Sequence, residues 1–100
     1  MLALHVIAGP DSGRVHPLPT GEPQLVGRST EALGSSDPAM SRRHAELTPS
    51  AGEWFVRDLS STGGTWVNGQ RAEVRTALRE GDELRCGDTV MRVVRADDAI

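Results

Sequence analysis

Short segments in which apolar and polar residues alternate recur along the chain and predict β-strands. Residues 2–8 and 83–86 show this alternation, so each segment can place one face toward a core. Residues 54–56 and 90–94 are β-branched or aromatic runs, which also favour strands. Turn-forming residues separate these segments at short intervals, as a sandwich of antiparallel sheets requires. We therefore expect an all-β sandwich of two antiparallel sheets.

One hairpin is indicated by the Asn-Gly dipeptide at 68–69, because both of its positions tolerate positive φ. This dipeptide would join a strand at 65–67 to a second strand at 71–73. Helical periodicity is weak, and its best candidate is residues 72–79, which glycine would end within about two turns. A single short turn is expected at 37–40, where aspartate can cap and proline occupies the first helical position.

The composition is that of one small domain with room for a local anion site. One hundred residues fit a single unit with a core at about 2–95, which we expect to be a monomeric module of a larger protein. The net charge is -3, which disfavours a nucleic-acid footprint, and all 11 basic residues are arginine. Cys86 is the only cysteine, so we expect a buried core thiol and no disulfide or cysteine-rich zinc site. The absence of a long apolar run argues against membrane insertion and favours a cytoplasmic protein.

The densest polar cluster lies in three expected loops, at 27–29, 41–44 and 58–65. In a sandwich such loops can gather at one end. Together they would form a cradle for an anion, with guanidinium groups from Arg28 and from Arg42 or Arg43, and hydroxyl groups from Ser41 and Thr62. A phosphate monoester fits this cradle because it carries about -1.5 to -2 charges and three acceptor oxygens.

These three blocks resemble the signature of forkhead-associated (FHA) domains. The matching residues are Gly27-Arg28, then Ser-Arg-Arg-His at 41–44, then Asp-Leu-Ser-Ser-Thr-Gly-Gly-Thr-Trp-Val-Asn-Gly at 58–69. The resemblance covers about residues 2–95, and it implies an eleven-stranded β-sandwich whose loops bind phosphothreonine peptides without turnover or a cofactor. Modules of this kind often end larger bacterial proteins, including secretion ATPases of the FtsK/SpoIIIE type.

The resemblance also implies a role for each matching residue. Arg28 resembles the phosphate clamp, Ser41 the hydroxyl donor, Arg42 a second phosphate or peptide contact, and Thr62 a contact near the phosphothreonine. The structural positions of the loops are Gly27, His44, Gly64 and Asn68, of which His44 braces the loops without touching ligand. Gly63 departs from the pattern, because the family commonly has an asparagine there that bonds the peptide backbone. The lack of this hydrogen bond would cost roughly 0.5 to 1.5 kcal/mol of binding energy, while leaving the phosphate site in place.

Other interpretations of these residues remain open. The sandwich could be a phosphate-independent scaffold whose site has decayed at Gly63. Taken alone, Arg28 would fit a surface ion pair, Ser41 and Thr62 would fit local turns, and Arg43 fits a solvated strand position.

Catalysis and metal or base binding are weaker alternatives. Ser41, His44 and Asp58 could form a hydrolase triad, but no nucleophile-elbow motif accompanies them. The three histidines, including His5 and His16, lack metal-ligand spacing, so we expect no metal. Trp54 and Trp66 are better explained as packing residues at strand ends than as a platform for stacking bases.

Overall fold

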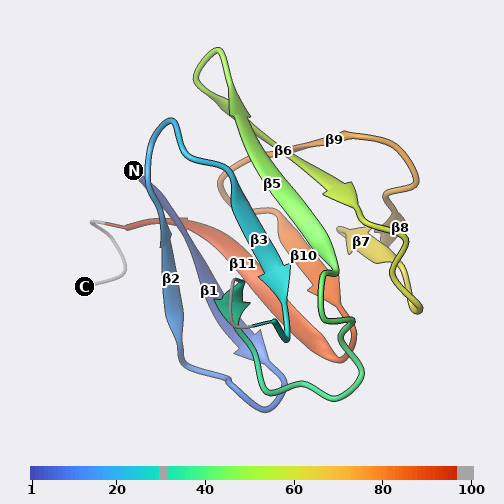
Figure 1. Cartoon of the computed structure of the whole chain (residues 1–100). Helices are drawn as coiled ribbons and strands as arrows, with labels where there is room; N and C mark the ends of the chain where they lie inside the picture. The colour runs from blue at the N-terminus through green and yellow to red at the C-terminus, as the bar shows by residue number, and fades with distance from the viewer. Residues whose placement is uncertain (30–31, 97–100) are drawn as a thin grey trace.

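The computed structural model describes residues 1–29 and 32–96, which form eleven strands in two layers (Figure 1). One sheet has the order β2-β1-β11-β10-β7-β8 and the other the order β4-β3-β5-β6-β9. No helix occurs among the described residues, so none is long and apolar enough to cross a membrane. The strands are β1 (Leu2–Ala8), β2 (Val15–Leu18), β3 (Gln24–Gly27), β4 (Leu33–Gly34), β5 (Ala45–Ser50), β6 (Glu53–Asp58), β7 (Thr65–Val67), β8 (Gln70–Arg71), β9 (Thr76–Leu78), β10 (Glu83–Cys86) and β11 (Thr89–Arg95).

The all-β sandwich is confirmed, with one departure from the antiparallel rule. Strand β4 runs parallel to β3, with Val26 opposite Leu33 and Gly27 opposite Gly34. Two full-length parallel strands must be joined by a long crossover connection. Strand β4 has only two residues, so a short connection after β3 is enough to bring it alongside the end of β3. The pairing packs the Leu33 side chain against the core, and this burial stabilises the short strand.

The core lies between the two sheets and is built from the inward-facing positions of both. Leu4 and Val6 of β1 belong to the same buried cluster as Leu47 and Val56 of the second sheet, and all four are at most 2% exposed. The alternation in the sequence therefore did mark the buried faces. Cys86 is also buried, as expected, and this burial raises the pKa of its thiol to about 12.

The predicted hairpin is present, with a shifted second strand. Asn68 and Gly69 both have positive φ, 51° and 82°, as a two-residue turn requires. The second strand is Gln70–Arg71, because pairing starts directly after the turn, and so the expected strand at 71–73 is wrong in its bounds.

The weak helical candidate at 72–79 does not form a helix, in line with the expectation of an all-β fold. Instead of a helix, this segment contains strand β9, in which Leu78 pairs with Trp54 of β6 and is buried. An edge strand that covers the core is more stabilising here than a two-turn helix, which would be marginal. The expected short turn at 37–40 is present and is closed by the Met40 amide, which donates to the Asp37 carbonyl.

Candidate anion-binding site

The end of β3 is joined to the 41–44 segment by backbone hydrogen bonds. The Arg28 amide donates to the Ser41 carbonyl at 3.2 Å, and the Ser29 amide donates to the Arg42 carbonyl at 3.0 Å. The approach leaves no room for a side chain at Gly27, because a Cβ there would lie 2.1 Å from the Arg42 carbonyl oxygen. Glycine at this position is what allows the two loops to meet.

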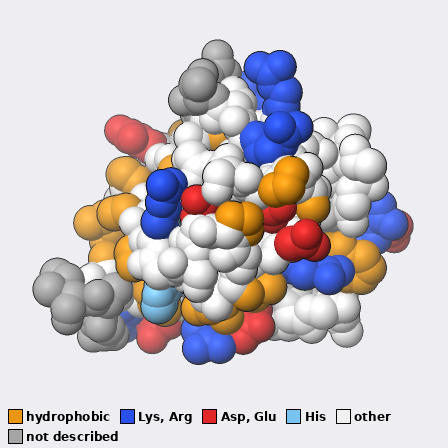
Figure 2. Space-filling view, turned by 90° about the horizontal axis from the view of Figure 1, so that it is seen from below, with side chains coloured by type: hydrophobic (Ala, Val, Ile, Leu, Met, Phe, Trp, Pro, Cys, Tyr) orange, Lys and Arg blue, Asp and Glu red, His pale blue; other side chains and the backbone are white. Residues whose placement is uncertain are grey.

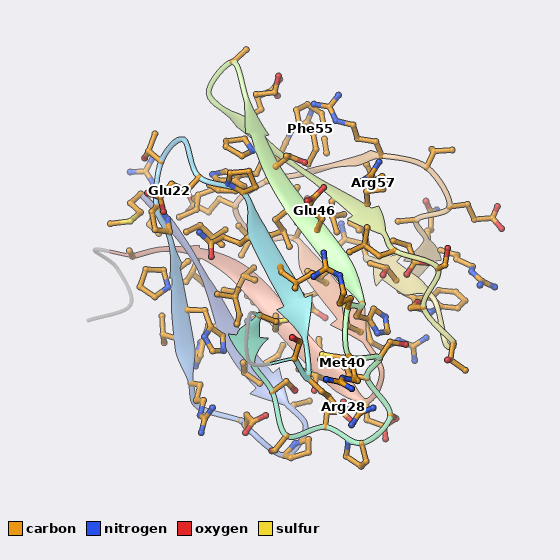
Figure 3. The ribbon with its side chains drawn as sticks, viewed as in Figure 1. Glu22, Arg28, Met40, Glu46, Phe55 and Arg57 are labelled. Atoms are coloured by element: carbon orange, nitrogen blue, oxygen red, sulfur yellow. The ribbon has the colours of Figure 1, made fainter. Side chains whose placement is uncertain are left out.

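The Arg28 side chain is held in place by the turn that precedes Ser41. Its Nε donates to the carbonyl oxygen of Met40 at 2.5 Å, and the Met40 side chain is itself buried in the core. Figure 3 shows Arg28 and Met40 beside each other at the lower end of the molecule. Within the described residues the terminal guanidinium nitrogens make no hydrogen bond or ion pair, and Arg28 is exposed. An oriented cation is therefore available to an incoming anion.

The hydroxyl of Ser41 joins this region to the β6–β7 loop. It accepts a hydrogen bond from the Thr62 amide at 3.1 Å. A serine hydroxyl can donate as well as accept, so its own proton is available to a ligand oxygen. The structure thus brings together Arg28, Ser41 and Thr62, three residues that lie in separate blocks of the sequence.

His44 is fully buried and bonds the backbone of both loops. Its Nδ1 accepts from the Ser41 amide at 3.1 Å, so Nε2 must carry the proton and donate to the Gly64 carbonyl at 2.8 Å. The tautomer is assigned from these partners. His44 therefore joins the two loops through these hydrogen bonds and does not present a ring nitrogen to a ligand.

The β6–β7 loop is organised by the carboxylate of Asp58. One of its oxygens accepts from the hydroxyl groups of Ser61 and Thr65, and the other accepts from the Ser61 amide. Burial alone would raise the pKa of Asp58, but the hydrogen bonds from Ser61 and Thr65 outweigh it, so its pKa lies below the ordinary value. The Ser61 hydroxyl in turn accepts from the Gly64 amide at 2.9 Å. The loop that carries Thr62 is thus fixed from within.

A second carboxylate, that of the buried Asp37, anchors the turn before Ser41. It accepts from the Ala39 amide and, across the sandwich, from the Asp88 amide and the Thr89 hydroxyl at 2.7 to 2.8 Å. Burial opposes ionisation, but the bonds from Thr89, Ala39 and Asp88 prevail, and the pKa of Asp37 is lowered. Sequence reasoning gave Asp37 only a local capping role. The contacts with residues 88 and 89 span 51 and 52 positions, and no local pattern could indicate them.

Two further supports of the site were also missed by the sequence. The Arg28–Met40 bond uses a backbone carbonyl, which no side-chain motif encodes. Asp11, in the β1–β2 turn, accepts from the amide and hydroxyl of Ser36, and so it holds the β4–β5 connection from the other side. Hydrogen bonds from Ser36 lower the pKa of Asp11 below its ordinary value.

The remaining candidate residues lie at the rim of the site or away from it. Arg42 and Gly63 are exposed next to Ser41 and Thr62, and Arg43 is exposed on the same segment. Asn68 lies in the β7–β8 turn, where its side chain donates to Asp82 and accepts from the Glu83 amide. It supports the hairpin and is not part of the cradle. Figure 2, viewed from this end, shows arginine side chains at the upper edge and others spread around the face.

The geometry does not support the catalytic alternative. In a triad the histidine accepts from the serine hydroxyl and donates to the carboxylate. Here both ring nitrogens of His44 bond backbone groups, and the Asp58 oxygens bond Ser61 and Thr65. Among residues 1–29 and 32–96, no group of three or more His, Cys, Asp or Glu side chains could hold a metal ion. What the arrangement offers is a fixed set of donors for an anion.

Comparison with known proteins agrees with this fold and with the motif. Residues 25–87 match the family model of the FHA domain. The FHA domain-containing protein FhaB of Mycolicibacterium smegmatis is 41% identical over 75 residues, which are 72% of this chain and 47% of FhaB. The chain thus spans about half the length of this curated relative.

Two solved structures share most of this fold. One comes from a study of phosphothreonine-dependent FHA domain interactions; it is 31% identical with a TM-score of 0.82, covering 93% of this chain and 94% of that chain. The other is EmbR of Mycobacterium tuberculosis in complex with a low-affinity phosphopeptide, 26% identical with a TM-score of 0.82, covering 93% of this chain and 24% of that chain. The match of sequence motif, strand arrangement and family model shows that this chain belongs to the FHA domain family.

Proposed function

We propose that this domain binds phosphothreonine-containing segments of partner proteins, as an interaction module in signalling or assembly that depends on Ser/Thr kinases. It would act in the cytoplasm as one module of a longer protein, without a cofactor and without chemical turnover. The relatives support this proposal, because one structure comes from a study of phosphothreonine-dependent FHA interactions and another holds a phosphopeptide.

The observation that carries the proposal is the hydrogen bond from the Thr62 amide to the Ser41 hydroxyl. It joins the two loops whose side chains the phosphate would touch, while backbone bonds join Ser41 to Arg28. In this arrangement Arg28 donates to the phosphate through its terminal nitrogens, and Ser41 donates through its hydroxyl proton. Arg42 adds positive charge at the rim, and Thr62 with Gly63 borders the peptide.

The phosphate group suits this site on electrostatic grounds. The nearby carboxylates of Asp37 and Asp58 are both occupied by hydrogen bonds from within the domain. The exposed groups at the rim are therefore guanidinium and hydroxyl donors. A dianionic phosphate forms charge-assisted bonds with such donors, each worth about 1.5 to 3 kcal/mol.

The test is a fluorescence anisotropy titration with a labelled degenerate phosphothreonine peptide library, run beside its threonine and phosphoserine versions. We expect saturable binding of the phosphothreonine library that is weakened about tenfold or more by Arg28→Ala. The matched control is Arg57→Ala, because Arg57 is an exposed arginine on β6 whose partner is Glu46, away from Arg28 (Figure 3). Binding that ignores phosphorylation, or that survives Arg28→Ala unchanged, would favour the phosphate-independent scaffold instead.

A further inference from the structure

A tryptophan flanked by two arginines lies on the outer face of the six-stranded sheet. Trp66 of β7 is opposite Arg71 of β8 on one side and opposite Arg85 of β10 on the other. The guanidinium carbons of Arg71 and Arg85 lie 6.0 Å and 4.9 Å from the centre of the indole ring. We call these three residues the Trp66 surface. The indole ring holds two positive charges close together on a chain whose net charge is -3.

The positive charge of the Trp66 surface is not neutralised by the described part of the chain. Arg57, Arg92 and Arg95 form ion pairs with glutamates, whereas Arg71 and Arg85 have no hydrogen bond or ion pair among residues 1–29 and 32–96. Glu83 borders the same face, but its carboxylate is 2.8 Å from the guanidinium of Arg92. Two exposed cations without a carboxylate partner attract an anionic ligand.

This surface is continuous with the proposed phosphopeptide site. The Trp66 indole N–H donates to the Gly63 carbonyl at 3.2 Å, directly beside Thr62. Arg71 lies against Gly64 so closely that a Cβ on Gly64 would be 2.9 Å from its Nε. Four residues of chain span at most about 14 Å, so the Trp66 backbone lies within that distance of Thr62. A bound peptide could therefore extend from one to the other.

The surface is also hollowed beside Trp66 and Arg85. A depression of about 380 Å³ is lined by Trp66, Gly69, Glu83, Arg85 and Val90. At Gly63, no described atom outside its chain neighbours lies within 4 Å of where a Cβ would be, so the space directly above this residue is open. The position at which the family commonly carries a peptide-binding asparagine therefore places no side chain between Thr62 and the Gly63 carbonyl that Trp66 binds.

We propose that the Trp66 surface is an extension of the phosphopeptide site, and that it selects partners carrying Asp or Glu about two to five positions from the phosphothreonine. This inference rests on the proposed function, because the phosphothreonine anchors the peptide beside it. Arg71 and Arg85 pair with the peptide carboxylates, and the indole ring holds both guanidinium groups in place. The acidic contacts offset part of the binding energy that is lost with the asparagine at position 63.

The test uses labelled peptides with one phosphothreonine in a Gly/Ser background. Each carries two Glu or two Gln residues, at positions two to five on either the N-terminal or the C-terminal side. We expect the Glu peptide to bind about two- to fivefold more tightly than its Gln counterpart on one of the two sides, as exposed ion pairs allow. That preference should fall toward unity in Arg85→Gln and Arg71→Gln, and also at 0.5 M salt, where screening is strong.

The matched control is Arg75→Gln, because Arg75 also stacks on an aromatic ring, 3.8 Å from the centre of Phe55 on the other sheet. It should leave the preference for Glu unchanged. Phosphate-dependent binding with equal affinity for Glu and Gln peptides would overturn the inference alone, as would a Glu preference that persists in both arginine variants. Absence of any phosphate-dependent binding would refute the proposed function and this extension with it.

Discussion

Replacing His44 with alanine should destabilise the domain and separate the two loops that form the site. His44 is 0% exposed, and its ring bonds the Ser41 amide and the Gly64 carbonyl. Both backbone groups lose their partner when the ring is removed. The loop that carries Ser41 and the loop that carries Thr62 then lose a shared support, so we expect losses in both stability and peptide affinity.

The size of the effect follows from the burial of each partner. An unsatisfied buried polar group costs about 1 to 3 kcal/mol. Gly64 is buried, so its carbonyl should cost about 2 kcal/mol, while half-buried Ser41 should cost about 1 kcal/mol because water can reach it. The cavity left by the ring adds about 1 kcal/mol. The free energy of unfolding should therefore fall by about 3 to 5 kcal/mol, a large part of the 5 to 15 kcal/mol typical of small domains.

Urea denaturation followed by tryptophan fluorescence measures this change, and His44→Gln provides the matched variant. The glutamine amide can donate from near the position of Nε2, so it should keep the bond to Gly64 and cost about half as much as alanine. A loss below about 0.5 kcal/mol for His44→Ala would refute the bracing role. Equal losses for both variants would show that the Gly64 bond contributes little.

Three further predictions concern glycines and carboxylates of the site. Gly63→Asn should leave the free energy of unfolding unchanged or raise it by up to about 1 kcal/mol, since Gly63 has neither positive φ nor close neighbours among the described residues. The variant should also bind phosphopeptide more tightly in a titration, and weaker binding would contradict the prediction. Gly27→Ala should cost about 2 kcal/mol or more in urea denaturation, because its Cβ would overlap the Arg42 carbonyl, whereas Gly63→Ala, as control, should not. Asp37 and Asp58 have a lower pKa in the folded state than their ordinary 3.8. Their contribution to the free energy of unfolding is therefore complete above about pH 5 and is lost as the pH falls through the folded-state pKa. Equal stability in urea denaturation at pH 7 and pH 3 would contradict this.

The sequence predicted the layers of the fold well because burial imposes a period of two on every strand. The alternation at 2–8 and 83–86 identified strands β1 and β10, and the Asn68-Gly69 turn was found from backbone chemistry alone. Strand β9 was missed because only three residues form it, too few for a period to be visible. Its identity is set by pairing with β6, a tertiary contact.

The sequence singled out candidate residues for the site but not the contacts that support them. Arg28, Ser41 and Thr62 were singled out because their types and spacing match a motif, and the structure does bring these loops together. The Met40 carbonyl that orients Arg28 and the Asp37 contact with Thr89 could not be predicted. Both depend on chain segments that meet only in the folded state.

Phosphothreonine binding at this site is tested most directly by an NMR titration of the ¹⁵N-labelled domain with a phosphothreonine peptide, beside the unphosphorylated peptide. We expect amide shifts to cluster at residues 28–29, 41–42 and 62–64, to occur only with the phosphorylated peptide, and to disappear in Arg28→Ala. Shifts that cluster elsewhere on the sandwich, or that are the same for both peptides, would contradict it.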